Sequence, residues 1–317
     1  MLFSREYEKF WVNKRYFVRF GGKNMKKNIF EGVGTALITP FSGGKIDFPA
    51  LERLIEFQIS AGIAALIIGG TTGEAATLSD SERYELYAFA KEKIGGRCAL
   101  MLGTGTNDTR VAIKHTRFAE ELGCDGALLV TPYYNKGTER GVVCHYRSIA
   151  ESTSLPLMLY NVPSRTGVNM SRATLENLAE VENIVAIKEA SDSADRLIEI
   201  ASMGDRLSLY AGNDTQLFTT LALGGKGVIS VVSNIAPRRM NRIYESFKSG
   251  DIFSARADQT AILPLIRAMF LETNPAPVKH AMARLGLSSG ELRLPLYEVS
   301  GETKRAIDIE LSRYRLL

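Results

Sequence analysis

Residues 184–189 have the sequence IVAIKE, an apolar run that ends in a lysine and a glutamate. Four successive apolar residues between polar neighbours are typical of a short strand buried on both faces. Such a strand carries Lys188 to its carboxyl end with apolar atoms behind it. Burial disfavours an ammonium, so a lysine there loses its proton near neutral pH, and the free amine can form a Schiff base with a ketone. This segment by itself favours an ordinary surface lysine after a strand, and the rest of the chain has to decide.

Other short apolar runs lie on both sides of this segment. They are Thr35–Thr39, Ala64–Ile68, Ala99–Leu102, Ala127–Val130, Leu157–Tyr160, Ser208–Ala211 and Val228–Val232. Amphipathic segments with helical spacing separate them, including Phe48–Ser60, Ser79–Lys93, Thr109–Leu122 and Arg140–Glu151. We expect Asp47 and Ser79 to cap helices, because each directly precedes a helical pattern or begins one. At Ser79, Glu82 three residues later completes a capping-box pattern.

Strands alternating with helices predict βαβ units and a parallel sheet. Counting residues 184–188, eight such units between Gly32 and about Ser249 indicate an α/β fold, a closed (β/α)8 TIM barrel. A doubly wound open sheet is the alternative, weakened because no Gly-x-Gly-x-x-Gly follows the first strand.

The pattern of alternating strands stops near residue 250. Residues Asp251–Phe270, Val278–Leu285 and Gly301–Tyr314 have helical patterns and form a predicted C-terminal helical appendage. We therefore predict a barrel catalytic domain over residues 25–250 and a C-terminal helical domain over residues 251–317.

The first 24 residues differ from the rest of the chain. They hold six basic and two acidic residues, so they account for the whole net charge of +4, and the remainder is neutral. A neutral body favours neither nucleic acid nor an anionic membrane as a partner. Because Met25-Lys26-Lys27 resembles a bacterial start, residues 1–24 are expected to be an upstream leader; a genuine extension is the alternative. Mass spectrometry of the natively expressed protein would decide, and an N-terminus at Met1 would refute the leader.

Composition excludes several other classes of protein. No apolar run approaches the roughly 18 residues that span a membrane. The odd, widely spaced cysteines Cys98, Cys124 and Cys144 indicate a reducing cytoplasm rather than a disulfide framework. The three histidines fall in separate segments, so no metal site is expected.

Unusual residues recur at the predicted carboxyl ends of the strands, where barrels place their chemistry. They include GGTTGE at 69–74, TPYYN at 131–135, YNVPSRTG at 160–167 and GND at 212–214. Each has an ordinary structural explanation, such as a turn or a packed tyrosine. Together with Lys188 they offer hydroxyls for a carboxylate or a proton relay and an arginine for a second carboxylate. This combination predicts imine chemistry on a 2-oxo acid.

The sequences GTTGE (70–74), TPYYN (131–135), YNVPSRTG (160–167) and IKE (187–189) together resemble the dihydrodipicolinate synthase family of pyruvate-dependent class I aldolases. The resemblance covers about Ile29 to the C-terminus, including NPAPVK at 274–279, and leaves residues 1–24 without a counterpart. It implies condensation of pyruvate with L-aspartate 4-semialdehyde to 4-hydroxy-tetrahydrodipicolinate, the first committed step toward diaminopimelate and lysine, with no cofactor.

The resemblance also implies catalytic roles. Lys188 forms the Schiff base, Tyr160 is the general acid and base, and Thr71 links Tyr160 to Tyr134 in a proton relay. In the family the second tyrosine comes from a neighbouring subunit, so the active form is expected to be a homo-oligomer, a homotetramer built as a dimer of dimers.

Substrate-binding roles follow from the same resemblance. Thr72 holds the pyruvate carboxylate, and Arg165 binds the semialdehyde carboxylate and positions Tyr160. The backbone carbonyls of Gly212 and Ile229 orient Lys188 and the bound intermediate.

The sequence departs from some family members at the positions that bind inhibitory lysine, and two alternative functions stay open. Positions that bind inhibitory lysine in enterobacterial-type members are Ala75, Asp80, Arg83 and Val111 here, although Asn107 and Tyr133 are retained. We therefore predict weak or absent lysine feedback, because Arg83 repels an ammonium. Sister enzymes acting on N-acetylneuraminate or 2-keto-3-deoxygluconate share the lysine and tyrosine, but the Ser-Arg-Thr-Gly segment fits a short carboxylated aldehyde better. A catalytically idle barrel is the other alternative.

Overall fold

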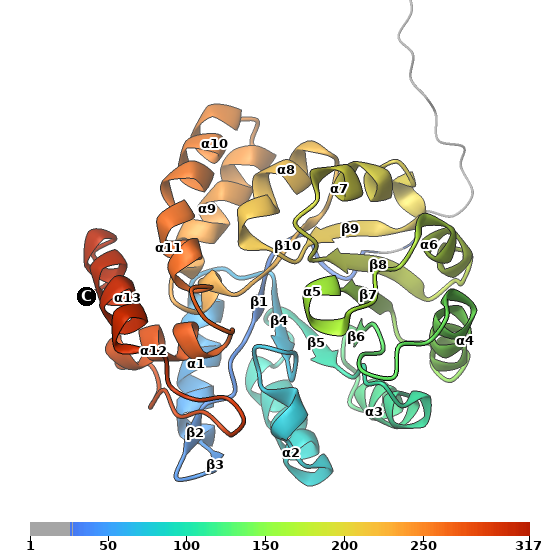
Figure 1. The fold of residues 1–317 in the computed structure, drawn as a ribbon, viewed down its shortest axis with the longest axis horizontal. Coiled ribbons are helices and arrows are strands. Elements are labelled where there is room, and N and C mark those ends of the chain that lie inside the picture. The colour runs from blue at the N-terminus through green and yellow to red at the C-terminus, as the bar shows by residue number, and fades with distance from the viewer. Residues whose placement is uncertain (1–25, 27) are drawn as a thin grey trace, which may run out of the picture.

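The computed structural model describes residue 26 and residues 28–317. Eight parallel strands form a closed barrel, each hydrogen-bonded to two neighbours, with helices around it (Figure 1). The barrel strands are β1 (Gly32–Ala36), β4 (Ala65–Ile68), β5 (Ala99–Gly103), β6 (Gly126–Val130), β7 (Leu157–Asn161), β8 (Ile184–Glu189), β9 (Ser208–Ala211) and β10 (Gly227–Ser230). The predicted barrel is confirmed; the predicted leader lies outside the described residues.

The helices follow the expected alternation. They are α1 (Phe48–Ser60), α2 (Asp80–Ile94), α3 (Thr109–Glu121), α4 (Glu139–Ala150), α5 (Pro163–Thr166), α6 (Arg172–Ala179), α7 (Ala194–Ala201), α8 (Leu217–Ala222), α9 (Pro237–Lys248), α10 (Ile252–Ala261), α11 (Leu263–Ala268), α12 (Ala276–Arg284) and α13 (Gly301–Arg313). Both predicted caps are confirmed. The Asp47 carboxylate accepts from the Ala50 amide, and Ser79 and Glu82 form a capping box.

Three predicted boundaries were wrong. The first strand begins at Gly32, three residues early, and its Gly34 lies where a Cβ would meet Phe30 and Ile67 at 2.8 Å. Glycines weaken a strand pattern in the sequence, although here close packing requires one. The eighth barrel strand ends at Ser230, because the next residues turn into a short 3-10 helix.

The third error concerns the C-terminal part. The expected single helix over 251–270 is two helices, α10 and α11, because Pro264 removes a backbone donor and starts a new first turn. Sequence analysis also omitted a small hairpin, β2 (Phe41–Ser42) paired with β3 (Lys45–Ile46).

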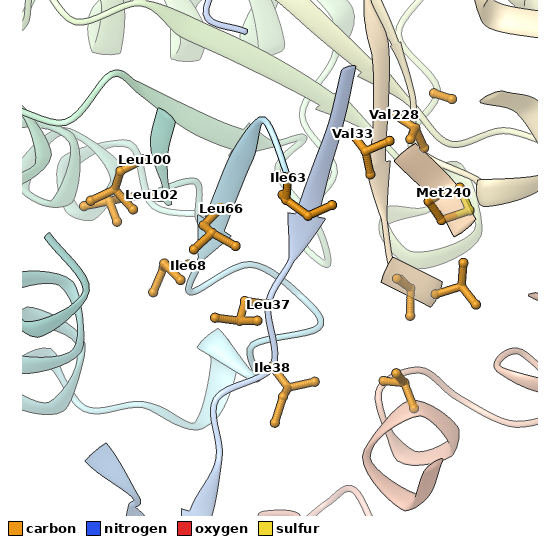
Figure 2. Packing of buried hydrophobic residues seen from close by; sticks show 14 of the residues in the cluster. Val33, Leu37, Ile38, Ile63, Leu66, Ile68, Leu100, Leu102, Val228 and Met240 are labelled. Carbon is orange, nitrogen blue, oxygen red and sulfur yellow. The ribbon is translucent and has the colours of Figure 1, made fainter. Parts of the chain in front are cut away.

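Apolar side chains pack on both sides of the barrel wall. Leu66 and Ile68 belong to the layer between strands and helices, whereas Ala65 and Ile67 belong to the cluster inside the barrel. This alternation follows from the two-residue period of a strand. Figure 2 shows part of the outer layer, where Val228 of β10 and Met240 of α9 belong to one cluster.

The C-terminal segment is tied to the barrel by charged contacts. Lys279 of α12 forms a buried ion pair with Glu74, and Arg293 pairs with Glu82 of α2. The described strands all end by Ser230, yet the proposed domain division at residue 250 stays a prediction. Within residues 28–317, the structure shows no helix with the length and apolar character needed to cross a membrane.

Candidate active site

A cavity of about 340 Å³ opens at the carboxyl ends of the strands. The predicted site residues that line it are Thr71, Thr72, Tyr160, Arg165, Lys188 and Gly212. These residues lie at or shortly after the carboxyl ends of β4, β7, β8 and β9, so closure of the barrel brings together Thr71 and Gly212, which are 141 positions apart in the chain.

Lys188 and Tyr160 face each other across neighbouring strands. They are direct partners in the register between β7 and β8, and the Lys188 Nζ lies 4.2 Å from the centroid of the Tyr160 ring. Only 5% of Lys188 is exposed, and burial lowers its pKa to about 7, with Asp214 opposing and Arg165 assisting the shift. A substantial fraction of the amine is therefore neutral and nucleophilic at physiological pH.

Asp214 is the carboxylate that faces this amine, and sequence analysis gave it no role. It is 1% exposed, and its Oδ2 accepts from the amides of Val231 at 3.0 Å and Val232 at 3.1 Å. Its Oδ1 has no hydrogen-bond partner among the described residues. Burial raises the pKa of Asp214, while the hydrogen bonds and Lys188 oppose that shift. The position after Gly212-Asn213 at a strand end was the available signal.

Tyr160 combines a buried ring with a hydroxyl near polar groups. Burial raises its pKa, while the charge of Arg165 and a hydrogen bond with the Thr71 hydroxyl lower it. A phenol with these neighbours can give up and take back a proton close to Lys188. The structure thus brings Lys188, Tyr160 and Thr71 together, as the sequence predicted.

The two predicted carboxylate-binding residues share one neighbour. Arg165 of α5 donates from Nη2 to the Asn274 carbonyl at 2.9 Å, and the Asn274 side chain donates from Nδ2 to the Thr72 hydroxyl at 2.9 Å. Thr72 is 3% exposed. Asn274 lies between α11 and α12, so the helical appendage contributes to the rim of the cavity.

Gly212 and Ile229 differ in how they meet the cavity. Gly212 lines it, and a Cβ there would come within 2.5 Å of the Ala190 Cβ, so close backbone packing requires glycine. Ile229 is buried inside the barrel on β10. It is not among the residues that line the cavity.

Tyr134 does not line the cavity that contains Lys188, although it lines a neighbouring larger cavity with Thr71 and Tyr160. It follows β6, its side chain is 90% exposed, and its backbone is in the left-handed region at φ 67°. Within residues 28–317, no hydrogen bond joins Tyr134 to Thr71. One chain therefore leaves the predicted relay open, as expected if a second copy supplies this tyrosine.

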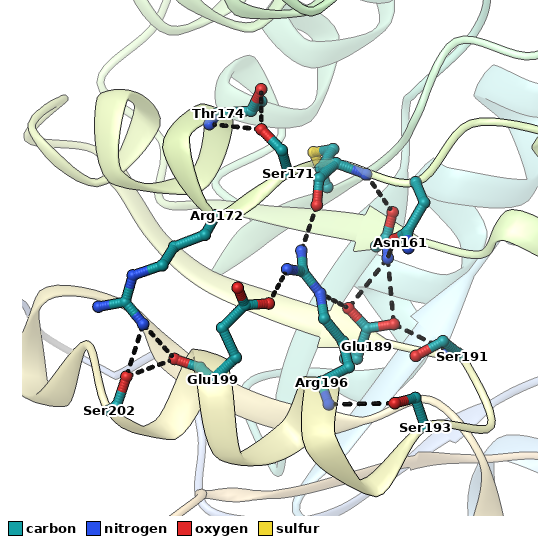
Figure 3. A network of polar contacts seen from close by, with 12 residues as sticks. Asn161, Ser171, Arg172, Thr174, Glu189, Ser191, Ser193, Arg196, Glu199 and Ser202 are labelled. Atoms are coloured by element: carbon teal, nitrogen blue, oxygen red, sulfur yellow. Dashed lines mark hydrogen bonds and ion pairs between the residues drawn. The ribbon is translucent and has the colours of Figure 1, made fainter.

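A second layer of polar contacts, absent from the sequence predictions, lies at the ends of β7 and β8 (Figure 3). Glu189 and Asn161 directly follow Lys188 and Tyr160, so they point to the opposite face. The Asn161 amide donates to both carboxylate oxygens of Glu189 at 3.1 and 3.0 Å, and Arg196 pairs with Glu189 at 3.4 Å. This network fixes the two strand ends relative to each other.

Comparison with known proteins decides the family. A sequence profile described as the dihydrodipicolinate synthetase family matches residues 29–313. The chain belongs to the dihydrodipicolinate synthetase family. This finding confirms the resemblance predicted from the sequence motifs.

Curated relatives and solved structures agree with this assignment. A 4-hydroxy-tetrahydrodipicolinate synthase of Thermotoga neapolitana is 45% identical over 280 residues, 87% of this chain and 95% of that protein. One from Clostridium novyi is 42% identical over 287 residues, 90% of this chain and 97% of that protein. The crystal structure of dihydrodipicolinate synthase from Thermotoga maritima superposes with a TM-score of 0.90 at 41% identity, covering 92% of this chain and all of that one.

A second, larger cavity of about 1030 Å³ shares Thr71, Tyr160 and Arg165 with the cavity that contains Lys188. Its lining includes Ala75, Asp80, Arg83, Val111 and Tyr133, the positions considered above for lysine feedback. The Arg83 guanidinium donates to the carbonyls of Ala75 at 2.7 Å and Gly103 at 3.4 Å. The structure therefore gathers these side chains around one cavity, while the strength of lysine feedback stays a prediction.

Proposed function

We propose that this protein is a 4-hydroxy-tetrahydrodipicolinate synthase, a lyase that condenses pyruvate with L-aspartate 4-semialdehyde in the first committed step of diaminopimelate and lysine biosynthesis. The observation that carries the proposal is the buried Lys188 amine, whose pKa of about 7 and position over Tyr160 suit imine formation. Membership of the family supports the same reaction.

The first half of the reaction binds pyruvate covalently. The neutral Lys188 amine attacks the ketone carbon, the carbonyl oxygen leaves as water, and an imine joins pyruvate to Nζ. Tyr160 gives a proton to the departing oxygen and, through Thr71, recovers one from the relay that Tyr134 of a neighbouring subunit completes. Thr72 holds the pyruvate carboxylate during these steps, and the Gly212 and Ile229 carbonyls orient the amine and the intermediate.

The second half forms the carbon–carbon bond and releases the lysine. Loss of a proton from the pyruvate methyl group gives an enamine, which attacks the aldehyde carbon of the second substrate, whose carboxylate Arg165 binds. The amino group of that substrate then attacks the imine carbon, closes the ring and displaces Lys188. One water is lost overall, and the product is 4-hydroxy-tetrahydrodipicolinate.

Borohydride reduction in the presence of pyruvate tests the imine directly. We expect Lys188 to gain the mass of pyruvic acid less one oxygen atom, located by peptide mass spectrometry. A coupled assay then compares aspartate semialdehyde with N-acetylneuraminate and 2-keto-3-deoxygluconate as substrates. If Lys188 carries no label, the result supports the alternative of a catalytically idle barrel. Faster turnover of either sugar acid would support a sister lyase.

We further propose a homo-oligomer, a homotetramer in the cytoplasm, in which Tyr134 completes the site of a neighbour. Its support is the 90% exposure of Tyr134, which lines the larger cavity together with Thr71 and Tyr160. Co-expression of Lys188→Met and Tyr134→Phe chains should restore activity, because mixed pairs contain one intact site. Lys188→Met with Tyr160→Phe is the matched control, since no mixed site is intact. Equal activity in the two mixtures would contradict the shared site.

A further inference from the structure

Asn274 is a buried residue of the helical appendage that touches the candidate site without being one of the predicted site residues. It is 5% exposed and lines the cavity that contains Lys188. Its side chain donates to the Thr72 hydroxyl, and its carbonyl accepts from Arg165. One residue thus meets both groups that are proposed to bind substrate carboxylates.

The direction of the Asn274 hydrogen bond determines what Thr72 can do. A hydroxyl has one proton to donate and two lone pairs to accept with. When the Asn274 Nδ2 donates to the Thr72 Oγ1, it occupies a lone pair and leaves the hydroxyl proton free for a ligand. Among the described residues this is the only side-chain hydrogen bond of Thr72, so none of them competes for that proton.

The remaining atom of the Asn274 amide is unusual for a residue that serves folding alone. Its Oδ1 is buried and has no hydrogen-bond partner among the described residues. An unpaired buried acceptor destabilises a fold, so its presence calls for an explanation other than folding. The Asn274 amide keeps this acceptor unused, while its donor group is hydrogen-bonded to Thr72.

We infer that Asn274 is a positioning residue for pyruvate: its amide orients the Thr72 hydroxyl so that the hydroxyl donates to the pyruvate carboxylate. The inference rests on the proposed function. Arg165 is held by the backbone carbonyl of Asn274 rather than by its side chain. Replacing the side chain consequently acts on pyruvate and spares the semialdehyde.

Two substitutions at Asn274 test this role with separate readouts for the two substrates. Asn274→Ala should raise the pyruvate concentration that half-saturates borohydride trapping by about tenfold, the cost of one misdirected hydrogen bond to a charged group. The KM for the semialdehyde should change by less than about threefold, because the Arg165 contact survives. Asn274→Asp should have the larger effect, since its carboxylate accepts the Thr72 proton and repels the substrate. An unchanged pyruvate half-saturation, or equal changes for both substrates, would overturn the inference.

A double-mutant cycle separates this role from general loosening. Once Thr72→Val has removed the hydroxyl, Asn274→Ala should add nothing to the pyruvate half-saturation. If the two substitutions instead multiply their effects on the pyruvate half-saturation, Asn274 does not act through Thr72. Arg293→Ala is the matched control, because it breaks the ion pair between the appendage and Glu82 without touching the cavity. It should lower Tm and leave pyruvate trapping unchanged. Failure of the wild type to trap pyruvate would instead refute the proposed function.

Discussion

Two buried lysines, Lys188 at the cavity and Lys279 in the helical appendage, each lie over an aromatic ring but have different charged partners. Each Nζ lies 4.2 Å from the centroid of an aromatic ring, Tyr160 for Lys188 and Phe41 for Lys279. Lys279 is 0% exposed, pairs with Glu74 and donates to the Glu291 carbonyl at 2.8 Å.

Among residues 28–317, Lys188 forms no ion pair. The negative charge that opposes the shift of its pKa is that of Asp214, and both residues line the cavity. Burial lowers the pKa of both lysines, but the ion pair with Glu74 opposes the shift at Lys279. Burial alone therefore does not make a lysine reactive. A reactive lysine also needs to be free of a direct carboxylate partner and to lie at an open cavity.

The largest effect is expected from Lys188→Met. Without the amine no imine forms, and kcat should fall by roughly 10⁴-fold or more. The fold should survive, because the change removes an unpaired buried amine. The measurements are borohydride trapping, the coupled assay and Tm. Retention of more than a small fraction of wild-type kcat would assign the chemistry to another group.

Tyr160→Phe makes the ring below Lys188 chemically like the Phe41 ring below Lys279. The cation–π contact is kept while the proton donor is lost, so kcat should fall by about 10²- to 10⁴-fold. Stopped-flow measurement of imine formation with pyruvate should show the same step slowed. A variant with wild-type kcat would show that the hydroxyl plays no part in proton transfer.

Lys279→Met should affect folding rather than chemistry. It leaves the buried Glu74 carboxylate without its partner, and the free energy of unfolding should fall by about 3–5 kcal/mol. Chemical denaturation measures the loss, and pyruvate trapping below Tm should persist. The double variant Glu74→Gln with Lys279→Met should recover part of that stability; no recovery would show that the pair is not the cause.

The lowered pKa of Lys188 predicts how both its reactivity and its effect on stability change with pH. Imine formation should rise with pH and level off above about 7, where the amine is neutral. In the unfolded chain the lysine titrates near its ordinary value of 10.5, so the unfolded state binds more protons between pH 7 and 10.5. The loss of unfolding free energy caused by burying Lys188 is therefore largest below pH 7 and disappears as the pH approaches 10.5. The Tm advantage of Lys188→Met should shrink over that range, and a pH-independent advantage would contradict the shifted pKa.

The smallest effect concerns lysine as an inhibitor. Arg83 lines the larger cavity at a position where an ammonium would be repelled. We expect half-inhibition by L-lysine at millimolar concentrations or above, measured in the coupled assay. Inhibition well below millimolar would show that Asp80 or another group in this cavity compensates for Arg83.

Much of the fold was predictable because local patterns and global structure agree. Apolar runs such as Leu157–Tyr160 lie within one residue of the observed strand, and α1 spans the predicted residues. The misplaced first strand and the split of residues 251–270 arose where Gly34 and Pro264 act through packing and backbone hydrogen bonding, which periodicity does not register.

The site shows the same division. The residue types at strand ends allowed Lys188, Tyr160, Thr71 and Arg165 to be placed together before any coordinates, because parallel strands deliver their carboxyl ends to one rim. Asp214, Asn274 and the network around Glu189 escaped notice, since their significance depends on which distant groups they meet.

The amino-acid sequence by itself determined the barrel, the family and the candidate Schiff-base lysine Lys188, because strand periodicity and a set of rare motifs are local properties of the chain. Only the tertiary structure decided which buried lysine is chemically available. Lys188 and Lys279 differ in the carboxylate and the cavity beside them, and both arise from contacts between residues far apart in sequence. A pKa is set by the surrounding charge and solvent, so it is fixed by folding.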